Sequence, residues 1–315
     1  MSHPIVSVVV PTYNHRDFVV ESVESALAQT LSAVEIVVVN DGSTDDTADR
    51  LAPLAQSGRI VYLEQPNRGP AHARNTGIEQ SRGRYIAFLD DDDLLPTDKL
   101  EWQTAFLDSR TDVAVVGGTL QLIDESGSLK RSVAHVPDIT VERLFSGNPF
   151  YSPGQTLIRR DVLESVGGLD PAIRGAEDWD LWFRIAKRRN MAMVDRLALY
   201  YRIHPGNASR HASRMVSVCS RTINRHLRDM SRERRPSLRA NAHTTIYDSF
   251  GSVLARAARR EWSMGRYVGA ARRVWSLRPI ARTIVLDPTL FRTFWTDLTR
   301  PPARDNASNA AFQAR

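Results

Sequence analysis

The sequence predicts an α/β fold, in which a mixed and mostly parallel sheet is flanked by helices and an α-helical extension follows at the C-terminal end. Three observations support this prediction. Runs of Val and Ile alternate with helical patterns through residues 1–110, shorter strand patterns with longer connections follow, and apolar side chains recur at helical spacing beyond residue 209. Repeated strand–helix units favour a parallel sheet that carries helices on both faces.

The first 110 residues contain the repeated units. Unbroken apolar runs predict the strands, and a spacing of three to four residues predicts the helices. Asp17 is placed to cap the first helix, and Ser43, with Asp46 three residues later, forms a weaker version of a capping box at the start of the second. The expected strands are residues 6–10, 34–39, 60–63 and 85–89, and the expected helices are residues 17–29, 43 onward and 71–80.

The pattern changes after Thr111. The expected strands are residues 113–118, 129–135, 155–159 and 197–203, and the expected helices are residues 178–189, 213–230, 241–263, 266–277 and 289–298. We therefore expect an α/β domain at residues 1–209, a basic helical region at 210–300 and a disordered tail at 301–315, where two prolines open a polar segment.

Composition restricts the class of protein. The chain has 315 residues, of which 42% are hydrophobic and 25% are charged, so it can bury a full core. Its single cysteine, Cys219, excludes an intramolecular disulfide and a cysteine-based zinc site, and it fits a reducing compartment. Residues 1–4 show no secretory pattern, and no run of about 18 apolar residues predicts a spanning helix. We expect a cytoplasmic protein.

Charge is divided unevenly along the chain. Residues 1–209 have a net charge of −8, whereas residues 210–315 carry 21 arginines, no lysine and seven acids, a net charge of +14. A basic segment of this kind predicts an acidic partner. Nucleic acid is the weaker alternative, because the arginines follow no recognition motif and aromatic residues are not regularly interleaved. The interpretation we prefer is a peripheral position at the inner face of the membrane, or a grip on a lipid-diphosphate acceptor.

Four consecutive aspartates, Asp90 to Asp93, follow the expected strand at 85–89. On an extended backbone alternate side chains share a face, so Asp90 and Asp92 point the same way. Paired carboxylates bind hard cations such as Mg²⁺ or Mn²⁺, and the carboxyl ends of parallel strands are where ligands bind in open α/β sheets. The sequence therefore predicts a metal site here. A solvated acidic turn is the alternative.

Two further strand ends carry polar residues, and we expect them beside the aspartates. The first strand ends in Pro11, Thr12, Tyr13 and Asn14. At the end of the second, Asp41 is placed to accept from a nucleobase N–H while Tyr13 stacks on the base; an ordinary turn is equally compatible with these residues. Arg74, one turn into the next helix, could reach a phosphate or the base, although most helical arginines are simply solvated.

Two motifs lie further along the chain. Glu177 and Asp178 precede a helix whose apolar face includes Trp179 and Trp182. Asp178 is a candidate general base for an acceptor hydroxyl, and a tryptophan could form the platform for the acceptor. The alternative is a pair of acids that complement the helix dipole above core aromatics. The later residues Arg202 and His204 could cover a diphosphate, and His204 could also join the metal, but a structural histidine is as plausible.

Taken together, these motifs resemble those of the family 2 glycosyltransferases, which have the Rossmann-like GT-A fold. The resemblance covers roughly residues 4–209. The matching stretches are residues 6–14, 35–45, 67–77, 85–96 and 177–182. Asn40 departs from the pattern, because many members have a second aspartate at this position. Residues 210–315 have no counterpart in the motifs.

The resemblance implies a role for each motif. Asp178 would be the base and Glu177 would support it. Thr12, Tyr13, Asp41 and Arg74 would hold the nucleoside. Asp90 and Asp92 would match the Asp-x-Asp motif that grips a metal-bound diphosphate. The complete predicted set for the nucleotide-sugar is Pro11, Thr12, Tyr13, Asn14, Asp41, Arg74, Asp90, Asp91, Arg202 and His204. The predicted metal ligands are Asp90, Asp92 and His204.

The implied activity is a metal-dependent, inverting glycosyltransferase. It would use Mn²⁺ or Mg²⁺ and move a sugar from a nucleoside-diphosphate sugar, with a UDP-sugar favoured, to a hydroxyl of a saccharide or lipid-linked acceptor in bacterial surface-polysaccharide assembly. Two alternatives remain. A sugar-phosphate nucleotidyltransferase also uses paired acids, but no glycine-rich, lysine-bearing loop follows the first strand. A non-catalytic protein could act through the basic C-terminal region.

Overall fold

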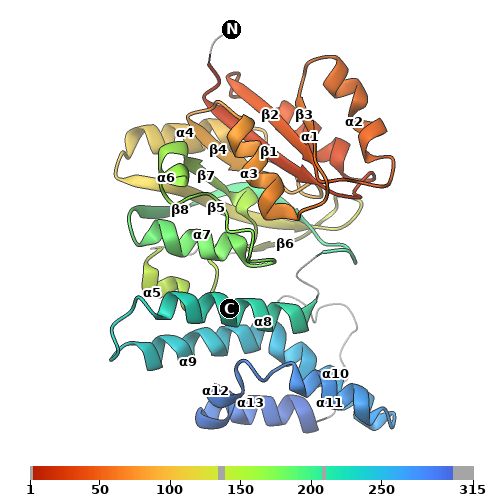
Figure 1. Ribbon diagram of the computed structural model, residues 1–315, viewed down its shortest axis with the longest axis vertical. Helices are drawn as coiled ribbons and strands as arrows, with labels where there is room; N and C mark the ends of the chain where they lie inside the picture. Colours follow the sequence, from red (N-terminus) through yellow and green to blue (C-terminus); the bar gives the residue numbers. More distant parts are fainter. Residues whose placement is uncertain (1–2, 134–138, 208–210, 301–315) are drawn as a thin grey trace. The chain divides into compact units, whose positions relative to one another are not determined.

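The computed structural model describes residues 3–133, 139–207 and 211–300, and the chain divides into two compact units (Figure 1). The α/β unit contains residues 1–141 and 149–204. The helical unit contains residues 142–148 and 205–315. The change from one to the other falls near the boundary that the sequence predicts at 209, but the short segment 142–148 belongs with the helices, which no sequence pattern indicates. The predicted tail 301–315 lies outside the described residues.

One mixed sheet of eight strands forms the centre of the α/β unit. Its strands are β1 Val6–Thr12, β2 Val34–Asn40, β3 Val61–Glu64, β4 Tyr85–Phe88, β5 Val113–Ile123, β6 Leu129–Val133, β7 Thr156–Arg159 and β8 Asn190–Arg202. The order is β3-β2-β1-β4-β7-β5-β6, with β8 also paired to β5. The first four strands are parallel, and β7 is antiparallel to both of its neighbours. The predicted mixed, mostly parallel sheet is confirmed.

Helices cover both faces of the sheet because its strands are apolar on both sides. The helices are α1 Val19–Leu27, α2 Thr47–Gln56, α3 Pro70–Gln80, α4 Lys99–Ser109, α6 Arg160–Ser165 and α7 Glu177–Ala186. Alternate β1 residues such as Val8 pack in one cluster with α1, α2 and α4. On the opposite face Ala73 of α3 packs against β2. Gly77 permits this close approach, because a Cβ there would overlap a methyl group of Val9.

Several predicted boundaries differ from the structure. Helix α1 begins at Val19 with Phe18 at its N-cap, so the predicted cap Asp17 is wrong. Helix α2 begins at Thr47 rather than at Ser43, so the predicted capping box is wrong. Instead, the Ser43 hydroxyl accepts from the N–H of Asn14, and the Asp45 carboxylate accepts from the N–H of Thr47. Strand β8 is also longer than predicted. It pairs with β5 through several register shifts, and such irregularities hide the period-two pattern in its first half.

The helical unit consists of short helices. They are α5 Val141–Leu144, whose first residue ends the first segment of the α/β unit, α8 Ala212–Leu227, α9 Arg235–Ile246, α10 Ser252–Ser263, α11 Tyr267–Trp275, α12 Ala281–Leu286 and α13 Pro288–Thr299. A π-helical segment, Tyr247–Gly251, joins α9 to α10, so the single helix predicted at 241–263 contains an irregular turn. Helix α12 has no counterpart in the sequence prediction. Among the described residues no helix is long and apolar enough to cross a bilayer.

Candidate active site

The candidate site lies where the carboxyl ends of three parallel strands meet. Strand β1 pairs with β2 on one side and with β4 on the other, which makes it the point where the strand order reverses. Ligands bind at such switch points in open α/β sheets. The N–H of Asp41 donates to the carbonyl of Thr12 at 2.8 Å, and the N–H of Tyr13 donates to Asp91 at 3.3 Å. Three motifs that are distant in the sequence therefore form one edge.

The turn after β1 is fixed by a side-chain hydrogen bond to the neighbouring turn. Asn14 has a φ of 56°, a left-handed conformation that asparagine tolerates better than most residues. Its side-chain oxygen accepts from the N–H of Thr44 at 2.7 Å, which ties this turn to the one after β2. Tyr13 remains 45% exposed, and the buried Thr12 hydroxyl has no hydrogen-bond partner within the described chain. Both side chains are thus in a position to contact a ligand.

Asp41 is buried and already accepts several hydrogen bonds. Its carboxylate accepts from the side chain of Gln65 at 2.7 Å and from the N–H groups of Arg68 and Gly69 at 3.0 and 2.7 Å. It thereby fixes the loop that leads into α3. A carboxylate offers about four lone-pair positions, so capacity for a nucleobase N–H is left. The predicted contact with the base stays a prediction.

Asn40 shows why an amide fits at the position where the family pattern has an acid. Its side-chain oxygen accepts from the N–H of Ser43 at 2.9 Å, and its amide nitrogen donates to the Tyr62 hydroxyl at 2.8 Å. A carboxylate could accept but could not donate. The asparagine at this position therefore has a hydrogen-bond partner on β3, the Tyr62 hydroxyl.

Arg74 connects the aspartates with the acids at the start of α7. Its guanidinium is nearly buried and donates to Asp90 at 2.5 Å and to Glu177 at 3.3 Å. Burial lowers the pKa of Arg74, but the two carboxylates outweigh that effect and hold the pKa above its usual value. The Nε–H group has no partner within the described residues. Arg74 therefore brings together residues that are about 90 positions apart, and this arrangement could not be read from either motif alone.

Asp90 has a second partner. Its other oxygen accepts from the Ser152 hydroxyl at 3.0 Å. Ser152 lies in the loop before β7, and it also caps the short 3₁₀ turn Pro153–Gln155. Ser152 is not among the residues predicted from the sequence, because a lone serine in a loop carries no signal of its own.

Asp91 points the other way, toward β1. His15 lies 2.6 Å from its carboxylate, and the hydrogen bond to Asp91 raises the pKa of His15 to about 9 although burial opposes it. The ring of His15 also meets the ring of His204 edge to face, with centroids 5.7 Å apart. His15 is also absent from the predicted site residues, although it directly follows the Pro-Thr-Tyr-Asn turn.

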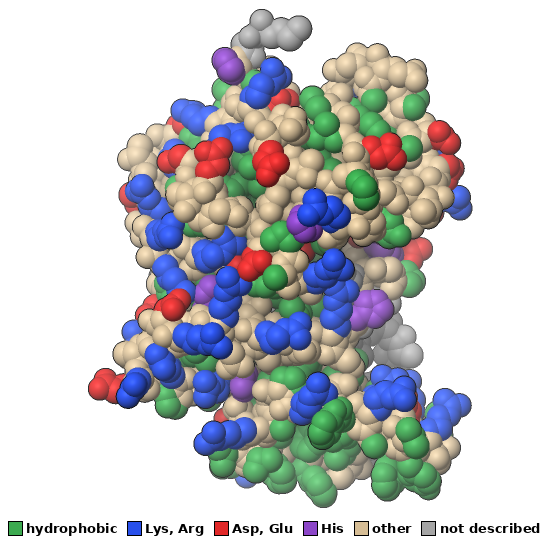
Figure 2. All heavy atoms as spheres, in the orientation of Figure 1, with side chains coloured by type: hydrophobic (Ala, Val, Ile, Leu, Met, Phe, Trp, Pro, Cys, Tyr) green, Lys and Arg blue, Asp and Glu red, His purple; other side chains and the backbone are tan. Residues whose placement is uncertain are grey.

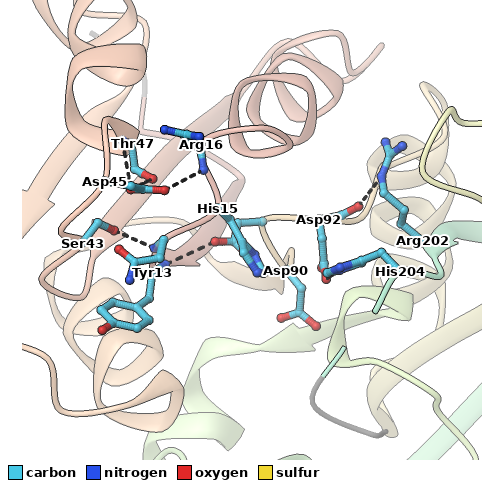
Figure 3. A network of polar contacts seen from close by, with 12 residues as sticks. Tyr13, His15, Arg16, Ser43, Asp45, Thr47, Asp90, Asp92, Arg202 and His204 are labelled. Atoms are coloured by element: carbon cyan, nitrogen blue, oxygen red, sulfur yellow. Dashed lines mark hydrogen bonds and ion pairs between the residues drawn. The ribbon is translucent and has the colours of Figure 1, made fainter. Parts of the chain in front are cut away.

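Asp92 and His204 form the centre of the predicted metal site (Figure 3). The Asp92 carboxylate lies 2.8 Å from Nε2 of His204, and burial raises the pKa of Asp92. Two ligands of one small divalent cation lie about 3 Å apart, so this spacing suits a shared ion. Asp90, however, is engaged by Arg74 and Ser152, and no group of three or more His, Cys, Asp or Glu side chains in the described chain is arranged around one point.

The donor set nevertheless fits a hard cation. Mg²⁺ and Mn²⁺ take carboxylate and imidazole ligands, and Mg²⁺ in particular is commonly held by one or two carboxylates together with substrate phosphates. Asp92 and His204 would supply such a partial set, with Asp90 beside them. A site of this kind is completed by the nucleotide rather than by the protein alone.

Arg202 holds the aspartate loop in place through hydrogen bonds to Asp92 and Asp93. It is buried, and its backbone N–H donates to Asp93 at 2.9 Å. Its guanidinium donates to the carbonyls of Asp92 and Glu125 at 2.8 Å and to the Glu21 carboxylate at 2.7 Å. In this conformation Arg202 positions the loop, and its predicted contact with a diphosphate would require these bonds to be exchanged.

The fourth aspartate is a structural residue. Asp93 is fully buried, and burial raises its pKa well above the usual value, with the charges of Asp92 and Asp90 adding to the effect. A neutral carboxylic acid costs less to bury than a charged one, and Oδ2 of Asp93 has no hydrogen-bond partner within the described residues.

The acids at the start of α7 differ in exposure. Glu177 is buried between Arg74 and the N–H of Gly175, whereas Asp178 is half-buried and accepts from the N–H of Trp179 at 2.7 Å. Asp178 can therefore be reached by a ligand, as a general base must be. Trp182 is fully buried against Phe150, with ring centroids 5.2 Å apart, and Trp179 is almost as enclosed. An acceptor could reach these tryptophans only if neighbouring segments moved, so their predicted role stays a prediction.

The comparisons with known proteins agree with this geometry. Residues 7–167 match the model of glycosyl transferase family 2. The chain belongs to this family. It is 33% identical over 231 residues to an uncharacterized glycosyltransferase of Rickettsia bellii, a match that covers 70% of this chain and 32% of the relative. The chain thus spans about a third of the length of the first curated relatives that it matches.

A further relative and a solved structure extend the comparison. The chain is 33% identical over 218 residues to the Escherichia coli UDP-Glc:alpha-D-GlcNAc-diphosphoundecaprenol beta-1,3-glucosyltransferase WfaP, with 65% of this chain and 80% of the relative covered. The crystal structure of S. aureus TarS 1-349 in complex with UDP-GlcNAc superposes with a TM-score of 0.67 at 18% identity and covers 93% of this chain and 88% of that one. This likeness shows the GT-A fold.

Proposed function

We propose that this chain transfers a sugar from a nucleoside-diphosphate sugar, with a UDP-sugar favoured, to a hydroxyl of a saccharide or lipid-linked acceptor. The observation that carries the proposal is the Asp90–Arg74–Glu177 link, because it holds the aspartate loop next to the candidate base Asp178. Family membership supports the reaction class. WfaP, whose name includes UDP-Glc and a diphosphoundecaprenol acceptor, and TarS with UDP-GlcNAc support the choice of UDP and of a lipid-linked acceptor.

The proposed reaction is a single displacement. Asp178 removes the proton from the acceptor hydroxyl, the acceptor oxygen forms a bond to the anomeric carbon, and the bond from that carbon to the diphosphate oxygen breaks. The nucleoside diphosphate leaves with the electron pair, and attack from the opposite face inverts the anomeric centre. Glu177, held by Arg74 and Gly175, keeps the start of α7 in place so that Asp178 faces the donor.

Nucleotide recognition would use the other strand ends. Tyr13 is exposed and could stack on the base, with Thr12, Asn14 and Asp41 around it and Pro11 fixing the end of β1. Asp92 and His204, with Asp90 nearby, would hold Mn²⁺ or Mg²⁺, which offsets the negative charge on the diphosphate. Asp91 fixes His15 beside this group. Location at the cytoplasmic side of a membrane, and a part in bacterial surface-polysaccharide assembly, stay predictions that the lipid acceptor of WfaP supports.

The experiment compares binding with turnover in Asp178→Asn. Loss of the base should lower UDP release from a UDP-sugar by about 10²- to 10⁴-fold in the presence of a lipid-diphosphate acceptor. The rise in melting temperature that UDP causes in the presence of Mn²⁺ should remain, because the proposed mechanism assigns Asp178 to the acceptor hydroxyl and not to the nucleotide. Asp92→Asn differs in the binding readout. It should lose the part of the UDP-induced rise in melting temperature that depends on Mn²⁺.

The exposed surface acid Asp161, on α6, provides the matched control, and Asp161→Asn should leave both readouts unchanged. Loss of the UDP shift in Asp178→Asn would remove Asp178 from the role of base. An unchanged Mn²⁺ effect in Asp92→Asn would remove Asp92 from the predicted metal ligands.

A further inference from the structure

Exposed apolar side chains are concentrated in one part of the helical unit. Ten of the thirteen exposed large hydrophobic residues in the described chain lie between Trp262 and Trp295. Figure 2 shows these green side chains gathered at the lower end of the view, over the helices that Figure 1 labels α10 to α13. We call this surface the C-terminal apolar face and define it by Trp262, Tyr267, Trp275, Leu286, Phe291 and Trp295.

These residues do not lie on the side of each helix that packs into the core. In α12, Ile284 is 4% exposed, whereas the next two residues, Val285 and Leu286, are each 68% exposed. In α13, Leu290 is buried while Phe291 is 43% exposed. Each helix therefore buries one apolar side within the unit and presents a second apolar side to the outside. Single exposed hydrophobic residues are common, but a gathered set usually marks a binding surface.

The rings of the C-terminal apolar face are already ordered against one another. Trp262 and Tyr267 lie edge to face with centroids 4.9 Å apart, and Phe291 and Trp295 are stacked at 6.3 Å. The Arg278 guanidinium lies 5.3 Å from the ring of Trp275. Trp and Tyr combine an apolar ring with a polar tip, which suits the boundary between lipid headgroups and acyl chains.

The charge around the face is strongly positive. Residues 256–300 contain ten arginines and three acids. Each acid has a partner inside the unit: Glu261 binds Arg273 at 2.8 Å, Asp297 accepts from the Tyr247 hydroxyl at 2.9 Å, and Asp287 caps α13. Most of the arginines are therefore not neutralised by acids of their own segment.

We propose that the C-terminal apolar face binds the surface of an anionic bilayer as a peripheral contact. The aromatic and aliphatic side chains enter the headgroup region, and the surrounding arginines pair with lipid phosphates, which the guanidinium fork can bind through two hydrogen bonds. A second copy of the chain fits less well, since two positively charged faces would oppose one another. Nucleic acid fits less well because exposed Val285 and Leu286 cannot stack on bases.

The test is flotation of the whole protein with vesicles, without nucleotide. The protein should float with vesicles that contain phosphatidylcholine and phosphatidylglycerol, and much less with phosphatidylcholine alone; added salt should weaken binding. The triple variant Trp275→Ser, Leu286→Ser, Trp295→Ser should lose at least about tenfold in partitioning. The triple variant Arg272→Gln, Arg278→Gln, Arg282→Gln should lose the preference for anionic vesicles.

The matched control replaces exposed apolar residues of the α/β unit, Val61→Ser with Leu129→Ser, and should bind vesicles like the parent. The proposal is overturned if the parent does not float with either vesicle, or if the apolar variant binds as well as the parent. Light scattering tests self-association. If the parent is a dimer that does not bind vesicles, and the apolar variant is a monomer, the face is assigned to self-association instead. The proposed membrane contact does not rest on the proposed transfer reaction, because flotation is measured without nucleotide. The rise in melting temperature that UDP causes is measured separately on the same variants, so the two proposals can fail independently.

Discussion

The two units of the molecule place their tryptophans in opposite ways. Of the six tryptophans, the three in the α/β unit are at most 7% exposed, and the three in the helical unit are 55–66% exposed. The buried arginines in the described chain, Arg74 and Arg202, also lie in the α/β unit, where they form ion pairs. Other arginines are exposed in both units, among them Arg84 in the first and Arg272 in the second. Burial of a charge is costly unless partners surround it. The α/β unit therefore encloses its tryptophans and two paired arginines, whereas the tryptophans of the helical unit lie on its surface.

The sharpest test of this difference compares two tryptophans. Trp182→Ala removes a fully buried ring beside Phe150 and should destabilise the α/β unit by about 3–5 kcal/mol. Trp275→Ala removes an exposed ring and should change stability by no more than about 0.5 kcal/mol. Urea unfolding followed by circular dichroism measures both values. Equal losses in the two variants would show that the C-terminal apolar face is covered within the protein itself.

The second test compares two arginines. Arg74→Lys keeps the charge but loses the planar fork that reaches Asp90 and Glu177 together, so stability should fall by about 2 kcal/mol. Arg272→Lys, on the exposed surface of α11, should be close to neutral. Melting temperatures at one pH and one salt concentration give the comparison. A neutral result for Arg74→Lys would mean that another contact holds the two acids.

The sequence was informative where local chemistry decides the structure. Runs of Val and Ile located β1 and β2, and the apolar run before the four aspartates located β4. The polar residues at the ends of these strands indicated which sheet edge carries the site. Tertiary contacts were harder to predict. Nothing near Arg74 indicates that it contacts Glu177, and Ser152 carries no pattern at all. The same limit applies to β8, whose irregular pairing with β5 masks its first half, and to Trp182, whose enclosure depends on a loop near Phe150.

The smallest expected effect concerns the lysines. Lys99 is fully buried, its ammonium group donates to the carbonyl of Thr156 at 3.3 Å, and burial lowers its pKa to about 7. In the unfolded chain this lysine titrates near its ordinary pKa, so between the two values the unfolded state binds more protons than the folded state, and stability rises with pH. Below the lowered pKa the cost of the buried charge is present in full.

Lys99→Met should therefore remove a rise in stability of about 1 kcal/mol between pH 7 and pH 8. Lys130, an exposed lysine paired with Asp124 at 2.7 Å, serves as the control, and Lys130→Met should keep the rise. Urea unfolding at the two pH values measures the difference. If the rise persists in Lys99→Met, a different titrating group causes it, and the burial of Lys99 does not set the pH dependence of stability.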